Sequence, residues 1–103
     1  MIDKVLIDSV PYRIDETDDP ILLDGIQCGG KVDYNLGVIQ LGKEYSVRGL
    51  TILMHEIVHA LMFERGIANE HNTEEVVDAL AKGIVNLIRD NKSLIEAIQN
   101  NQA

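Results

Sequence analysis

The chain has 103 residues, of which 17 are acidic and 9 are basic, so that its formal net charge is −8. This length fits one modest hydrophobic core, and we expect a single domain over residues 1–103. The acidic balance argues against nucleic acid or an anionic membrane as a partner, because binding to phosphates needs clustered Lys and Arg side chains.

Targeting and membrane signals are also missing from the sequence. Asp3 and Asp8 interrupt the first ten residues, whereas a signal peptide is first charged and then apolar. No apolar run approaches the roughly 18 residues of a membrane-spanning helix, and we therefore expect a cytoplasmic protein. Cys28 is the only cysteine, which excludes an internal disulfide and a cysteine-rich metal site. We expect it to be a small apolar filler rather than a nucleophile.

The amino-terminal part of the chain is rich in β-forming residues and turn signals. Residues 5–14 predict a strand bent at Pro11. Residues 15–19 contain four carboxylates and predict a solvated turn, because the spacing of an EF-hand calcium loop is absent. Residues 32–35 and 38–41 predict two more short strands. We expect these strands to form a three-stranded antiparallel sheet.

From about residue 45 the pattern becomes helical. Ser46 can cap a helix that runs to about Arg65, and Gly66 is its expected stop. This order of strands followed by helices predicts an α+β fold.

Two capping boxes predict the starts of two further helices. Asn72 with Glu75 precedes a helix over about residues 73–90, and Ser93 with Glu96 resembles a second box. The helix that ends near Arg65 carries the motif described next, and the helix over about residues 73–90 begins with an acidic turn.

The most specific motif is the sequence His-Glu-Ile-Val-His at residues 55–59. On a helix, His55 and His59 are about 40° apart around the axis and about 6 Å apart along it, so both rings can bind one metal ion. Glu56 lies beside them, where a carboxylate can take a proton from water that the metal activates. Apolar residues surround the motif, and unpaired imidazoles would be costly there. The segment therefore predicts a Zn²⁺ site with Glu56 as the catalytic general base.

A catalytic zinc ion needs a third protein ligand and an open position. In metzincin-type enzymes a glycine and a third histidine follow at fixed offsets, which fall here on Met62 and Arg65. His71 remains a candidate, although its polar surroundings are typical of an exposed histidine.

Three carboxylates at the start of the next helix are better candidates for the third ligand. Glu74 is in line with the apolar stripe through Val77 and Ala81, whereas Glu75 is on the wetter face. Asp78, one turn after Glu74, can be a ligand or can hydrogen-bond a ligand imidazole. We rank them Glu74, Asp78 and Glu75. An acidic first turn is also favoured by the helix dipole alone, with or without a metal.

Residues 50–61 and 73–81 together resemble the minimal gluzincin-type metallopeptidases of phages and mobile elements, which are related to the ImmA/IrrE group. The resemblance implies a zincin-like fold, in which a small antiparallel sheet packs on the motif helix and on the helix that carries the third ligand. It implies zinc ligands at His55, His59 and Glu74, within a Glu-x-x-x-Asp pattern that ends at Asp78. It also implies an edge strand that holds a peptide substrate beside the zinc ion. Longer members continue with a Leu-Leu-Met-Pro-like stretch that is absent here.

The leading hypothesis is a zinc metallopeptidase that cleaves a peptide or protein substrate, which by resemblance alone is a regulatory protein such as a repressor. The alternative is a non-catalytic, zinc-stabilised binding or regulatory module. A third reading is a structural domain without metal. A residue that stabilises the oxyanion is left open among Tyr34, Tyr45 and Arg48.

Overall fold

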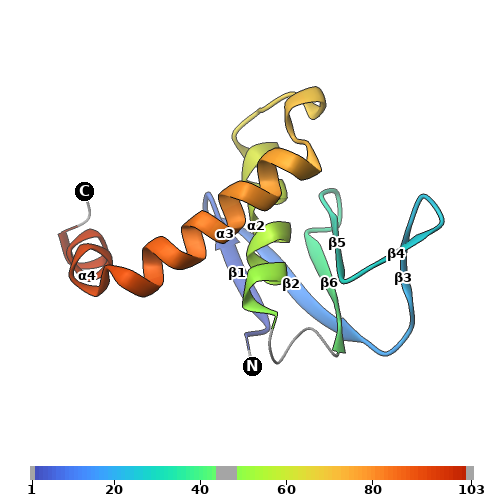
Figure 1. Ribbon diagram of the computed structural model, residues 1–103, viewed down its shortest axis with the longest axis horizontal. Coiled ribbons are helices and arrows are strands. Elements are labelled where there is room, and N and C mark those ends of the chain that lie inside the picture. Colours follow the sequence, from blue (N-terminus) through green and yellow to red (C-terminus); the bar gives the residue numbers. More distant parts are fainter. Residues whose placement is uncertain (1, 44–48, 102–103) are drawn as a thin grey trace.

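The computed structural model describes residues 2–43 and 49–101 and has an α+β architecture, as the sequence predicts (Figure 1). The strands are β1 (Lys4–Ile7), β2 (Val10–Thr17), β3 (Ile21–Leu23), β4 (Ile26–Cys28), β5 (Gly30–Asp33) and β6 (Val38–Gly42). The helices are α2 (Leu50–Glu64), the 3₁₀ turn η1 (Asn69–His71), α3 (Glu74–Asp90) and α4 (Lys92–Asn101).

Four strands form a sheet in the order β1-β2-β6-β5. The pairs β1–β2 and β5–β6 are antiparallel, whereas β2 and β6 are parallel, with Ile14 opposite Ile39. The expectation of three antiparallel strands is therefore wrong in strand number and in one pairing. The parallel pair arises because the chain leaves β2, makes the separate β3–β4 hairpin and returns through β5 before it reaches β6.

The predicted strand over residues 5–14 is in fact a hairpin. Asp8 and Ser9 form its turn, and both have positive φ angles, of 50° and 68°. Two such residues in succession match the right-handed twist of the flanking strands. Pro11 therefore lies within β2 rather than at a bend.

The acidic segment over residues 15–19 is only partly a turn. β2 continues to Thr17, and Asp15 and Glu16 are paired with Gln40 and Leu41 of β6. The prediction of a solvated turn over the whole segment is wrong, because pairing with β6 extends the strand by three residues beyond the expected end.

The hydrophobic core has two parts, which fix α2 from opposite sides. The larger cluster joins the sheet to α2 and consists of Ile7, Tyr12, Ile14, Ile39, Leu41, Leu53 and Ala60. The smaller cluster joins Val58 of α2 to Val77 and Ala81 of α3. Helix α2 thus lies between the sheet and α3 (Figure 1). The hydroxyl of buried Tyr12 donates a 2.6 Å hydrogen bond to Glu64 at the end of α2 and ties that end to β2.

The predicted stop of the motif helix at Gly66 is confirmed. Gly66 has a φ angle of +77°, which residues with a side chain rarely adopt, and its N–H bonds the carbonyl of Phe63. Ser46, the expected cap of this helix, lies outside the described residues.

The expected caps of the last two helices are both shifted. Thr73, rather than Asn72, caps α3, with its hydroxyl accepting a bond from the N–H of Val76 at 3.4 Å. Ser93 is already inside α4, which begins at Lys92. Within residues 2–43 and 49–101, no helix has the length and apolar character needed to cross a lipid bilayer.

Candidate metal centre

Helix α2 carries the two histidines and Glu56 on a firmly packed element. Leu53 and Ala60 pack against the sheet, while Val58 packs against α3, so the rotation of α2 about its axis is fixed. His59 and Glu56 are each only 7% exposed. Side chains held in this way by packing on two sides are well suited to form a metal site.

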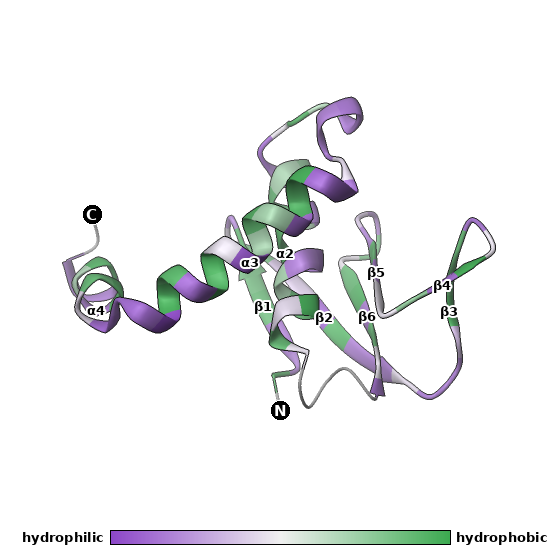
Figure 2. Cartoon of the chain, viewed as in Figure 1, coloured by the Kyte–Doolittle hydropathy of each residue, from purple (hydrophilic) through white to green (hydrophobic). Residues whose placement is uncertain are grey.

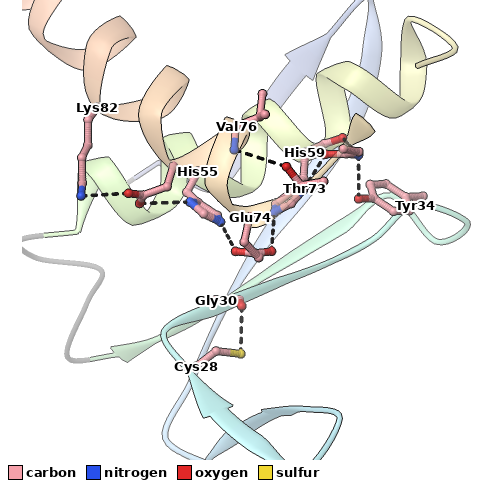
Figure 3. A network of polar contacts seen from close by, with 11 residues as sticks. Cys28, Gly30, Tyr34, His55, His59, Thr73, Glu74, Val76 and Lys82 are labelled. Atoms are coloured by element: carbon pink, nitrogen blue, oxygen red, sulfur yellow. Dashed lines mark hydrogen bonds and ion pairs between the residues drawn. The ribbon is translucent and has the colours of Figure 1, made fainter. Parts of the chain in front are cut away.

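The third side chain of the cluster is Glu74, the first residue of α3. Its Oε2 lies 2.8 Å from Nε2 of His55, and its Oε1 lies 2.8 Å from Nε2 of His59. Figure 3 shows both rings turned toward this one carboxylate. One ligand atom from each of the three side chains lies within 4.8 Å of the others, so the group is compact enough to hold a metal ion. The structure thus brings together the three residues that the sequence ranked first.

Asn72 fixes the orientation of the His59 ring. The Asn72 Nδ2 donates to the backbone carbonyl of His59 at 3.1 Å, which can only accept, so Oδ1 is the end that faces Nδ1 of the ring at 2.7 Å. Nδ1 must then carry a proton and donate it. The neutral ring consequently presents the lone pair of Nε2 to Glu74.

This arrangement leaves one unfavourable contact, between His59 and Glu74, that a bound cation would make favourable. A lone pair on Nε2 of His59 and a carboxylate oxygen of Glu74, 2.8 Å apart, repel each other unless a proton or a metal ion lies between them. Two imidazole nitrogens and one carboxylate are also the donor set of known catalytic zinc sites. By the chemistry of its donors, the cluster fits a zinc ion.

Asp78 lies on the far side of His55, as the sequence suggested for a supporting residue. Its Oδ1 is 3.7 Å from Nδ1 of that ring, and its Oδ2 accepts from Lys82 at 2.9 Å. The Lys82 ammonium holds the pKa of Asp78 below its usual value, through this hydrogen bond first and its charge second. Asp78 is therefore an anion beside the imidazole, at a distance too long for a direct hydrogen bond to Nδ1.

The remaining ligand candidates lie apart from the cluster. Glu75 is exposed and is not a member of the three-residue group. His71 is in η1 with a 70% exposed side chain, and its nearest acidic partner is Glu70 at 3.6 Å.

Glu56 is the buried carboxylate of the site. Its side chain lines the cleft and lies against Gly30 of β5, where a Cβ atom would come within 3.1 Å of the Glu56 Cγ. A side chain at position 30 would therefore push against Glu56. Burial, and secondarily the negative charge of Glu74, raise the pKa of Glu56 to about 7 in the metal-free protein.

The cluster opens into a cleft with a volume of about 530 Å³. One wall is β5 with Tyr34, and the opposite wall is formed by α2 and the start of α3. Tyr34 stacks on Phe63 at a centroid distance of 4.5 Å, and its hydroxyl accepts a 3.4 Å bond from Asn72. Burial raises the pKa of Tyr34, so it is a neutral hydroxyl at physiological pH. Tyr45 and Arg48, the other candidates for oxyanion binding, lie outside the described residues.

Cys28 also borders the cleft, which the expectation of an apolar filler did not foresee. Its thiol donates to the carbonyl of Gly30 at 3.2 Å, and the residue is half-buried (Figure 3). The thiol therefore has a polar contact and a surface on the cleft.

No protein-family model, curated protein or solved structure matches this chain significantly. The function must therefore be argued from the chemistry of the site.

Sequence reasoning missed two residues of the site, Asn72 and Gly30. The spacing of Asn72 and Glu75 is typical of a helix cap, and it gave no indication that Asn72 bonds His59 and Tyr34. Gly30 looks like an ordinary turn glycine beside Gly29, and only the approach of Glu56 shows why a side chain is excluded there.

Proposed function

We propose that this chain is a zinc-dependent metallopeptidase with a minimal zincin-like fold. In this proposal His55, His59 and Glu74 bind Zn²⁺, and Glu56 is the general base. The observation that carries it is the convergence of both Nε2 atoms on one carboxylate, each at 2.8 Å. The resemblance to the minimal gluzincin-type metallopeptidases related to the ImmA/IrrE group belongs to the same proposal.

When bound, zinc would act as a Lewis acid that polarises a carbonyl group and lowers the pKa of water. Glu56 would take a proton from the attacking water as the new C–O bond forms. It would then deliver that proton to the amide nitrogen as the C–N bond breaks, so that atoms and charges balance. The burial of Glu56 in the cleft wall supports this role, because it keeps bulk water away from the carboxylate.

The shape of the cleft supports a peptide as substrate. β5 is an edge strand of the sheet, and Gly30, Lys31 and Val32 line the cleft. An extended peptide can pair with the backbone of such a strand while its carbonyl faces the metal site. We further propose Tyr34 as the oxyanion donor, because its contact with Asn72 uses a lone pair and leaves the hydroxyl proton to donate.

A second candidate function is a zinc-stabilised module without catalysis. Its supporting observation is that the three candidate ligands come from two helices, so that an ion would join α2 to α3. The two functions share the metal site and differ in whether Glu56 has a chemical task.

The first test is metal content, measured on untagged protein after reconstitution with zinc and dialysis. We expect about one zinc ion per chain in the wild type and in Glu75→Ala, and none in His59→Ala or Glu74→Ala. Glu75 is the matched control because it is the next acidic residue of the same helix turn. A wild-type chain without zinc would overturn the proposal, and zinc retained by Glu74→Ala would overturn the ligand set.

The second test separates the two functions. A pool of denatured-protein peptides is incubated with zinc-loaded wild type and with Glu56→Gln, and new peptide ends are identified by mass spectrometry. We expect wild-type cleavage to fall by about 10²- to 10⁴-fold in Glu56→Gln, with its zinc content unchanged. If the zinc-loaded wild type cleaves nothing while zinc raises its melting temperature, the non-catalytic module is the correct function.

A further inference from the structure

The second half of α3 and the whole of α4 form an extension that we call the arm, residues 84–101. Figure 1 shows the arm leading away from the sheet and the β3–β4 hairpin, with α4 at the far end of the molecule. None of the described residues of α4 is buried, and α3 is the element with which it mainly packs. Ile84, at the start of the arm, packs against the smaller hydrophobic cluster, and the rest of the arm lies outside both clusters.

The arm nevertheless has an apolar stripe with helical spacing. Leu87 and Ile88 of α3 are 52% and 43% exposed, and Leu94 and Ile98 of α4 are 46% and 52% exposed. Leu87 and Ile88 are adjacent, and Leu94 and Ile98 are four residues apart, so that each pair lies on one side of its helix. Figure 2 shows apolar segments in both helices of the arm. A helix of ten residues is marginal in water without packing of its apolar face. Packing of this stripe against a partner would therefore stabilise α4.

The distribution of charge indicates what kind of partner would pack on the apolar stripe of the arm. The arm contains two basic residues, Arg89 and Lys92, and two acidic ones, Asp90 and Glu96, so its net charge is zero. The whole net charge of −8 lies outside it. A strongly basic or acidic partner would find no matching field on the arm, whereas a second neutral arm with the same stripe would fit it.

We propose that the arm is a dimerisation surface, on which two copies of this chain associate through their apolar stripes. Two half-helices of α3 and two α4 helices would form a four-helix core related by a two-fold axis. Because each arm leads away from its own acidic body, this contact joins two segments of zero net charge and keeps the two acidic bodies apart. This proposal does not depend on the metal site.

The test is the mass of the full chain in solution, by sedimentation velocity over a range of protein concentrations. We expect the wild type to approach twice its chain mass of 11.5 kDa, and the double variant Leu87→Lys with Ile98→Lys to sediment as a monomer. The matched control is Asn86→Lys with Asn100→Lys, which adds the same charge to the same helices on the polar side and should remain dimeric. Circular dichroism confirms that the variants are folded.

A second measurement keeps the proposal testable if the Lys variant fails to fold. The melting temperature of a dimeric wild type rises with protein concentration, whereas that of a monomer does not. A wild type that stays monomeric, with a melting temperature independent of concentration, overturns the proposal. A dimer that persists in the folded Lys variant also overturns it, because the interface would then lie elsewhere. A chain that stays monomeric but binds a different protein through the arm would likewise overturn the proposal, because that protein would then be the partner of the stripe.

Discussion

The two halves of α3 have the same sequence pattern and different surroundings. In the first half Val77 and Ala81 are fully buried against α2, whereas in the second half Leu87 and Ile88 face solvent. The apolar stripe continues, but α3 crosses α2 at an angle, so that its second half leads away from that helix (Figure 1). An apolar stripe in a sequence therefore shows that a helix needs a partner, and the fold decides whether the same chain supplies it.

The largest expected difference between the site region and the arm is in how a carboxylate makes the free energy of unfolding depend on pH. Glu56 has a pKa of about 7 in the folded metal-free protein, against 4.5 for the ordinary value, so unfolding releases a proton between these two pH values. The free energy of unfolding should therefore fall as pH rises from 4.5 to 7, by up to about 3 kcal/mol. Glu56→Gln should remove this decline and be the more stable protein above pH 7.

Urea unfolding of chelator-treated protein at several pH values measures this effect. The control is Glu96→Gln on exposed α4, which should keep the wild-type dependence on pH. If Glu56→Gln and the wild type change in parallel, the carboxylate is not held in the buried position seen in the structure.

The second difference concerns packing. Val77→Ala removes two buried methyl groups between α2 and α3 and should lower the free energy of unfolding by about 2 kcal/mol. Leu87→Ala in the arm should change it by less than about 0.5 kcal/mol at concentrations where the chain is monomeric. Urea unfolding of both variants measures the contrast. An equal loss in dilute protein would mean that the arm is covered by its own chain.

The third and smallest difference concerns polar contacts with the histidines. Asn72→Ala removes the acceptor of the His59 Nδ1 proton and should weaken zinc binding by at least about tenfold. Asn86→Ala, an exposed amide in the arm, should leave the affinity unchanged. Competition with a chromophoric zinc chelator gives both values. Unchanged affinity in Asn72→Ala would show that the ring keeps its orientation without this bond.

The parts of the structure that the sequence predicted are those that local periodicity determines. The placement of His55 and His59 on one side of α2 and the stop at Gly66 both follow from helix geometry and glycine stereochemistry. The α+β class follows from the order of the patterns.

The parts that were missed depend on contacts between distant segments. The parallel pairing of β2 with β6 crosses about 25 residues and leaves no trace in the alternation of either strand. Asn72 has partners 13 and 38 residues away, at His59 and Tyr34, so its role could not be distinguished from that of a cap. Glu74 was expected on the apolar side, yet its side chain is 71% exposed, because it lies at the first residue of α3 where the helix emerges beside the cleft.

The continuity of α3 has a mechanical consequence. The helix has 17 residues, which makes it about 25 Å long, and it carries Glu74 at one end and Ile88 near the other. Its fulcrum is the buried pair Val77 and Ala81, closer to Glu74 than to the far end. If a force on the outer end tilted α3 about this pair, the Glu74 carboxylate would shift relative to both imidazoles. A partner bound to the outer end of α3 would then change the distances between the Glu74 carboxylate and the Nε2 atoms of His55 and His59.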